Sequence, residues 1–226
     1  DLQTTWYLTY DEQRLYAAFE CELPAEGLPK SSETRRDGSV GTDDSVEMLL
    51  QPQDAAEGDV YHFIGNSLGT IHDEFRRETA WNGRWQFRTH SSRGGWSGEF
   101  SIPWEDLGTR PPDGQTWRAN FCRSVGKFTA WADSGRGYVA SPQCYGHVRF
   151  VSGDLLMQVG PIPGLERGET RVALRAVNTA KTANRAVVGV RSRTLLAAQH
   201  KELSRVNTPE WHSVRQCSLA AGTSND

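Results

Sequence analysis

The chain is predicted to be an all-β protein: an antiparallel β-sandwich of jelly-roll type, followed by a short β-rich C-terminal segment. Three observations support this fold class. Short segments alternate apolar and polar side chains, which is the period-two pattern of strands with one buried face. Clusters of Gly, Pro, Asn and Asp separate these segments, as turns do. Eight tryptophans among 226 residues supply the large rings that fill sandwich interiors.

The first predicted element is a β-hairpin over residues 4–22. Apolar and polar residues alternate on both sides of a turn at Asp11-Glu12-Gln13. Residues 24–42 contain Pro, Gly, Ser and charged residues, so they are predicted to form a long surface loop. Residues 51–59 are predicted to form a polar turn.

The most informative element is the strand predicted at residues 45–50. Val46, Met48 and Leu50 fall on one face of it, and Glu47 falls on the other. A strand that buries three apolar side chains on one side needs no charge on the other. Glu47 is therefore expected to point to water or to line a polar surface of the sheet.

More alternating segments follow along the chain, at residues 61–66, 95–104 and 117–123. Residues 70–94 are predicted to be loop with one strand near 85–90, and residues 124–146 to be loop. Pro103 opens and Gly108 closes a predicted short helical turn. Together the alternating segments predict an antiparallel sheet with an apolar inner face and a face carrying Glu, His, Asn and Arg.

The domain boundary is predicted near residue 152. Residues 1–152 are expected to form the sandwich, and residues 153–226 a partial β-rich, possibly immunoglobulin-like unit. Strands are predicted in this second unit at 171–178 and 186–191. The small polar tail at 220–226 is predicted to be disordered.

The bulk numbers exclude several classes of protein. A net charge of −3 argues against a nucleic-acid partner, and no apolar run approaches the ~20 residues of a membrane span. The four cysteines lack CxxC spacing, which argues against a zinc knuckle and leaves both a disulfide and free thiols open. The start at Asp1-Leu2-Gln3, with no Met or visible signal peptide, suggests a mature or truncated form or a fragment.

The order of motifs carries a family resemblance. The motifs are WYLTYDEQRLYAAFE, DDSVEMLLQP, YHFIGNSLGT, GGWSGEFSIPWEDLG, WRANFCR and PQCYGHVRF. Over about residues 4–150 the chain resembles carbohydrate-binding module family 9, a DOMON-like β-sandwich, whose usual first strand is expected before residue 4. The resemblance implies a non-catalytic, secreted module that binds a carbohydrate, in an extracellular or periplasmic location. It also implies neighbouring domains, commonly a glycoside hydrolase.

Sugars are held by aromatic stacking and by hydrogen bonds from planar polar groups. The residues proposed to bind the ligand are Glu47, His62, Asn66, Trp81, Glu99, Arg118, Asn120 and Arg123. An alternative is a structural network in which Arg118 and Arg123 neutralise Glu47 and Glu99. Members of the family that bind the ends of polysaccharide chains use two tryptophans and an arginine. When this sequence is aligned on the motifs, the corresponding positions hold Gly41, Val139 and Ile64.

Other functions remain open at this stage. The same sandwich would serve as a structural or interaction module if its sugar site has decayed. No catalytic residue is assigned, although Glu47 and Glu99 on one face would be the pair to test for glycoside hydrolysis. The resemblance allows a structural Ca²⁺ on the acidic loops, but no EF-hand spacing supports it. The candidate oxygen donors are Asp37, Asp43, Asp44, Asp54, Glu57 and Asp59. With only Met48 and Met157 as methionines, a haem site is disfavoured.

Overall fold

The structure is a computed structural model, and its chain divides into two compact units, residues 1–151 and 152–226. In the first unit it describes residues 2–132 and 141–151. In the second unit it describes the backbone of five strands. These strands are β11 (Leu155–Val159), β12 (Leu174–Asn178), β13 (Asn184–Ser192), β14 (Trp211–Leu219) and β15 (Ser224–Asn225).

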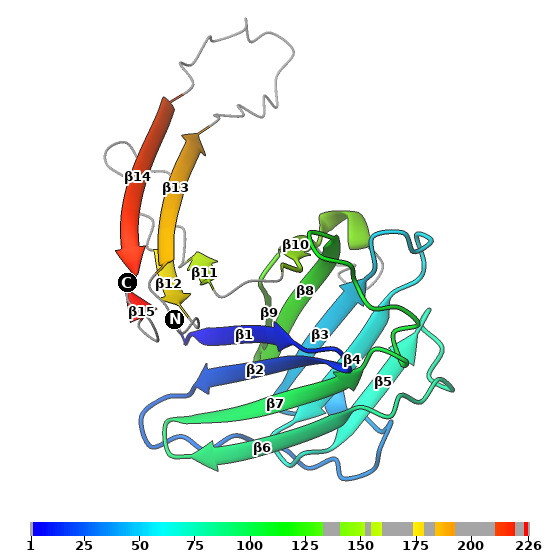
Figure 1. The fold of residues 1–226 in the computed structure, drawn as a ribbon. Helices are drawn as coiled ribbons and strands as arrows, with labels where there is room; N and C mark the ends of the chain where they lie inside the picture. Colours follow the sequence, from blue (N-terminus) through cyan, green and yellow to red (C-terminus); the bar gives the residue numbers. More distant parts are fainter. Residues whose placement is uncertain are drawn as a thin grey trace, which may run out of the picture. The chain divides into compact units, whose positions relative to one another are not determined.

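The first unit is an antiparallel β-sandwich, as predicted (Figure 1). One sheet has four strands in the order β1-β2-β7-β6. These are β1 (Thr4–Tyr10), β2 (Arg14–Glu22), β7 (Gly95–Pro103) and β6 (Gln86–Ser92). The predicted hairpin is confirmed, because β1 pairs with β2 from Thr4↔Cys21 to Tyr10↔Leu15.

The second sheet has six strands, five of them in the order β10-β8-β3-β4-β5, with β9 also pairing with β8. Its strands are β10 (Gly146–Arg149), β8 (Thr116–Val125), β3 (Ser45–Gln51), β4 (Tyr61–Asn66), β5 (Ile71–Phe75) and β9 (Lys127–Ala130). Two short 3₁₀ turns, η1 (Val40–Thr42) and η3 (Pro142–Cys144), lie in the connections. Strand β3 is central, pairing with β4 on one side and β8 on the other.

The core lies between the two sheets and is largely aromatic. The apolar positions of the alternating segments are buried there: Val46, Met48, Phe63, Trp96, Phe100, Ile102, Trp117 and Phe121. Trp6 joins the sheets, with its ring centroid 5.8 Å from that of Phe100 and 5.0 Å from that of Phe121. Trp85 stacks on Phe100 at 5.5 Å with an interplanar angle of 9°.

Several local predictions are corrected. Strands β5 and β9 lie in segments expected to be loop. Residues 103–108 form a turn closed by consecutive i→i+3 hydrogen bonds, such as Leu107 N to Trp104 O. In the second unit, β12 and β13 overlap the two predicted strands, whereas β11, β14 and β15 lie where none was predicted. The described residues contain no helix long and apolar enough to cross a membrane.

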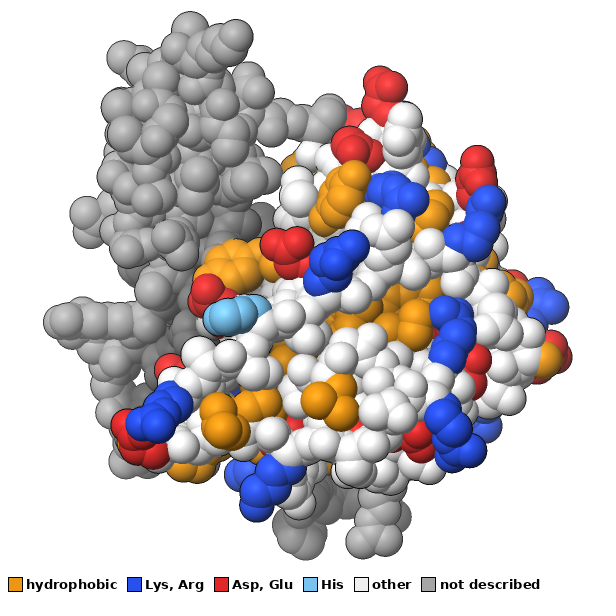
Figure 2. All heavy atoms as spheres, turned by 90° about the horizontal axis from the view of Figure 1, so that it is seen from below, with side chains coloured by type: hydrophobic (Ala, Val, Ile, Leu, Met, Phe, Trp, Pro, Cys, Tyr) orange, Lys and Arg blue, Asp and Glu red, His pale blue; other side chains and the backbone are white. Residues whose placement is uncertain are grey.

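The surface mixes both signs of charge. Figure 2 shows acidic and basic side chains interspersed on the face that it presents, with hydrophobic side chains in small groups between them. This face does not carry the single-sign charge that draws nucleic acid to a protein. It agrees with the net charge of −3.

Removal of the ring of Phe100 tests the packing of the core. Phe100 is 0% exposed, and its ring packs against those of Trp6 and Trp85 in the core. Phe100→Ala should lower the free energy of unfolding by about 3–5 kcal/mol, because a cavity replaces the ring. Urea denaturation followed by tryptophan fluorescence measures this. As a control, Leu68→Ala, at a side chain 56% exposed, should change the free energy by less than about 0.5 kcal/mol. Equal effects would contradict the packing.

Candidate functional site

The predicted polar face divides between two sheets. Strand alternation and register place Glu47, His62, Asn66, Arg118 and Asn120 on the outer face of the six-stranded sheet. The prediction of one shared polar face is therefore wrong for Glu99 and Arg123.

Glu99 lies on β7, exposed on the outer face of the four-stranded sheet. The core separates it from Glu47, so these two carboxylates cannot flank one glycosidic bond. Arg123 lies on the inner face of β8, at the end of the sandwich. Its guanidinium donates hydrogen bonds to Gln3 O, Thr4 Oγ1 and Glu22 O, which ties the two sheets together. Neither residue reaches Glu47.

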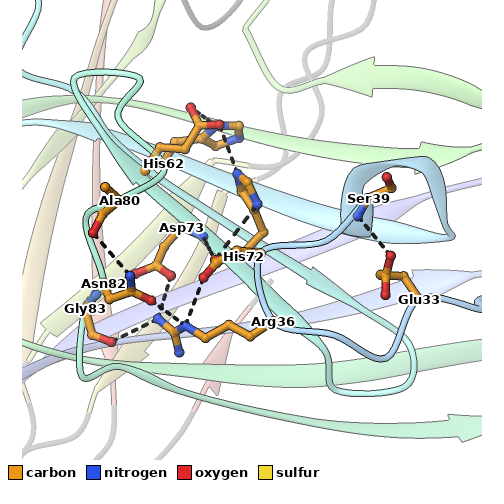
Figure 3. A network of polar contacts seen from close by, with 11 residues as sticks. Glu33, Arg36, Ser39, His62, His72, Asp73, Ala80, Asn82 and Gly83 are labelled. Carbon is orange, nitrogen blue, oxygen red and sulfur yellow. Dashed lines mark hydrogen bonds and ion pairs between the residues drawn. The ribbon is translucent and has the colours of Figure 1, made fainter.

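A chain of alternating acids and histidines crosses the outer face of the six-stranded sheet (Figure 3). Glu47 Oε2 lies 2.8 Å from His62 Nε2. His62 Nδ1 lies 3.8 Å from Glu74 Oε2, and Glu74 Oε1 lies 2.9 Å from His72 Nε2. The partner of Glu47 is thus His62, and the expected neutralisation by Arg118 and Arg123 is wrong.

Burial and charge act in opposite directions on His62. Burial disfavours its protonated form, but the contacts with Glu47 and Glu74 outweigh burial and raise the pKa of His62 above 6.5. His62, with a further contribution from His72, lowers the pKa of Glu74 to about 2. The arrangement therefore favours a charged imidazolium between two carboxylates, held at a fixed place on the sheet.

A second network supports this chain from the edge of the sheet. Arg36 Nη2 lies 2.6 Å from Asp73 Oδ1 and 3.2 Å from Gly83 O, and Arg36 Nε donates to Asn82 Oδ1 at 2.9 Å (Figure 3). Asp37 connects the two networks, with its carboxylate 3.4 Å from Arg36 Nε and 4.0 Å from His72 Nδ1. These contacts fix the long loop beside β5.

Two of the predicted ligand-binding amides have structural roles. The side chain of Asn66 donates to Glu33 O and Asp43 Oδ2 and accepts from Leu68 N and Thr70 N. Asn120 donates to Ala132 O and accepts from Ala132 N and Phe121 N. Both side chains are fully buried, so neither presents a free amide to a ligand.

Arg118 and Trp81 also lie away from His62. Arg118 is exposed at the end of β8, where it donates to Gln51 Oε1 at 3.2 Å. Trp81 packs by its edge against Tyr61 at 5.6 Å and Phe63 at 6.0 Å, as part of the core. The ring predicted to be a stacking platform is therefore packed against core aromatics.

A pocket of about 360 Å³ opens beside the acid–histidine chain. Its lining includes Glu57, Val60, His62, Glu74, Arg76, Arg77 and Pro142. Sequence analysis identified His62 as a ligand-binding residue and Glu57 only as a possible calcium ligand. The other charged residues come from β5 and the turn that follows it. The volume lies within the ~300–1,000 Å³ range of small-molecule sites.

The aromatic clamp of the resembling family is not formed by the described residues of this face. Gly41 and Ile64 occupy the positions named from the sequence, and Ile64 is buried. Val139 lies outside the described residues. No aromatic ring is among the residues that line the pocket. The pocket is thus polar, with hydrogen-bonding and charged groups around Val60 and Pro142.

The acidic loops use their carboxylates internally. Asp43 accepts from the backbone N–H groups of Ser32 and Glu33, and Asp59 pairs with Arg76. Within residues 2–132 and 141–151, no group of three or more His, Cys, Asp or Glu side chains is placed to hold a metal ion. Cys21, Cys122 and Cys144 are free thiols.

The pH dependence of stability tests the acid–histidine chain. Because the pKa of His62 is raised on folding, its contribution is present below pH 6.5 and is lost as pH rises through the folded pKa. The contribution of Glu74 is present above pH 4.5 and is lost as pH falls towards about 2. The chain therefore stabilises most between pH 4.5 and 6.5. His62→Gln should flatten the decline in melting temperature from about pH 6 to about pH 9. The exposed His147→Gln should leave it unchanged; an unchanged decline in His62→Gln would refute the assignment.

Comparison with known proteins reveals similar folds but no close relatives. No protein-family model matches the chain, and no curated protein sequence matches it. A family 9 carbohydrate-binding module from Caldicellulosiruptor kristjanssonii in complex with glucose has a TM-score of 0.53 and 18% identity, over 68% of this chain and 79% of that one. Its cellotriose complex gives 0.52 and 19%, over 67% and 76%. A proposed carbohydrate-binding protein from Bacteroides uniformis gives 0.54 and 19%, over 66% and 78%.

These likenesses establish the fold at low sequence identity. The matched share of this chain, 66–68%, is about the size of the first unit of 151 residues. The resemblance found in the sequence is thereby supported by independent structural similarity. The chain has the antiparallel β-sandwich fold of family 9 carbohydrate-binding modules.

Proposed function

We propose that this protein is a non-catalytic carbohydrate-binding module, which binds a glycan in the pocket beside His62. The observation that carries the proposal is this polar pocket of about 360 Å³, whose buried imidazole is held between two carboxylates. Its structural neighbours include modules that bind glucose and cellotriose. By the same analogy, the chain would belong to a secreted carbohydrate-active protein with further domains.

The chemistry of the pocket suits a polyol. Carboxylate, imidazole and guanidinium groups can donate to and accept from several hydroxyls, and charged partners form the stronger hydrogen bonds. Because Glu47 and Glu74 already fix His62, little ordering is required when a ligand binds. The described lining offers no ring for stacking, so affinity for a neutral sugar should be weak.

A second function is favoured by one departure from the family pattern. Gly41 and Ile64 replace two of the groups that grip a sugar in family members. A sandwich that lacks these sugar-binding side chains would serve as a structural or interaction module. The two functions differ in a direct binding measurement.

Titration calorimetry against a broad panel of mono- and oligosaccharides tests the proposal. Wild type should bind at least one of these sugars. His62→Gln should lower that affinity at least about tenfold, because it removes the charged partner that orders Glu74 at the pocket. Its melting curve should show that it remains folded.

The matched control is His90→Gln on the opposite sheet. His90 is exposed on β6 and lines a separate shallow depression with Tyr7, Glu20 and Glu99. This variant should bind like wild type. A loss confined to His90→Gln would move the site to the four-stranded sheet. Wild type that binds no sugar would favour the structural-module function.

A further inference from the structure

The turn that follows β5 places arginines in a strained backbone. Glu78 N donates to Phe75 O at 2.9 Å, which closes a four-residue turn. Its two central residues both have positive φ, 56° at Arg76 and 64° at Arg77. Turns of this kind favour Asn and Gly, because a side chain in the left-handed region meets its own backbone. Non-glycine residues held in such a conformation cluster at binding sites.

Arg76 has a clear structural role in this turn. Its Nε and Nη2 bind the two carboxylate oxygens of Asp59 at 2.6 Å and 3.1 Å. Its backbone N–H donates to Val60 O at 3.1 Å, and its guanidinium lies 5.0 Å from the centroid of the Phe75 ring. Arg76 therefore fastens the turn to the loop on the other side of the pocket.

Arg77 differs from its neighbour. It is exposed, it lines the pocket, and no carboxylate within residues 2–132 and 141–151 pairs with it. Its charge is also felt by the buried Tyr145 phenol, where it opposes the rise in pKa that burial causes. The turn thus holds at the pocket a cation that pairs with no carboxylate of the described part of the chain.

The nearest acids on the sheet are already neutralised. Glu74 lies between His62 and His72, and Glu47 lies against His62. Glu57, exposed on the lining, is the remaining carboxylate of the pocket. A planar guanidinium matches a carboxylate with two parallel hydrogen bonds. An acidic ligand would therefore complete the pairing of Arg77.

We infer that the pocket selects acidic sugars, and that Arg77 binds the carboxylate of a uronic acid residue. This inference rests on the proposed function of the same pocket. Glu74, held in place by His62, accepts hydrogen bonds from the sugar hydroxyls, while Arg77 distinguishes a uronic acid from its neutral counterpart. The strained turn is retained because it directs this side chain to the ligand.

The test compares matched pairs of methyl glycosides by titration calorimetry: glucuronic acid with glucose, and galacturonic acid with galactose. Wild type should bind at least one acid about tenfold more tightly than its neutral partner, and added NaCl should reduce the difference. Arg77→Gln should abolish the preference for the acid. Glu57→Gln should strengthen acid binding, because it removes a like charge.

Two further variants separate recognition from folding. Arg77→Gly should lose the preference for acids yet raise the melting temperature, because glycine adopts the left-handed conformation without strain. Arg93→Gln is the matched control; Arg93 is exposed on the four-stranded sheet and pairs with Glu26 at 2.8 Å. It should bind both members of each pair like wild type. A lower melting temperature in Arg77→Gly would overturn the argument from strain.

The outcomes distinguish this inference from the function on which it rests. Equal binding of acidic and neutral sugars, still reduced by His62→Gln, overturns the role of Arg77 and leaves the carbohydrate site in place. A preference for acids that persists in Arg77→Gln also overturns it. If no sugar of either kind binds, the proposed function fails and the role of Arg77 fails with it.

Discussion

The burial of β3 on both of its faces is the constraint on which the rest of the first unit depends. All seven residues of this strand are buried, although it carries Glu47. A buried carboxylate needs a partner, because an unpaired buried charge costs about 3–5 kcal/mol. His62 on the adjacent strand supplies the partner, and Glu74 and His72 extend the pairing to the edge of the sheet. The same contacts fix the floor of the pocket.

The fold could be predicted because most strands obey period two. Val46 and Met48 enter the core as the alternation requires. Strand β5 was missed because its inward middle residue is Asp73, a carboxylate that is 0% exposed. Arg36 and the backbone N–H of Gly83 compensate this charge from distant loops. Such long-range compensation leaves no periodic signal in the sequence.

The site was predictable only in part, for two physical reasons. Alternation relates residues within one strand, and it correctly places Glu47 on the face opposite the core. The same alternation puts Arg123 and Asn120, three positions apart on β8, on opposite faces of the sheet, so the prediction of one shared face contradicted it. Sheet membership depends on pairing between distant segments, so Glu99 could not be assigned to the other sheet from its own strand. Arg77 lies in a turn without Gly or Asn, where the usual turn signal is absent.

The polar character of the pocket follows from the same compensation of charge. A neutral hydrogen bond to a ligand replaces one to water, with a net gain of only about 0.5–1.5 kcal/mol, so neutral sugars are usually held by aromatic stacking as well. The lining that the structure describes has no Phe, Tyr or Trp ring. It has the imidazole of His62, fixed by Glu47, and the guanidinium of Arg77, which pairs with no carboxylate of the described residues. Charge-assisted hydrogen bonds are about twice as strong as neutral ones. A ligand with its own charge would use this pocket most effectively, because the protein has already ordered the groups that meet it.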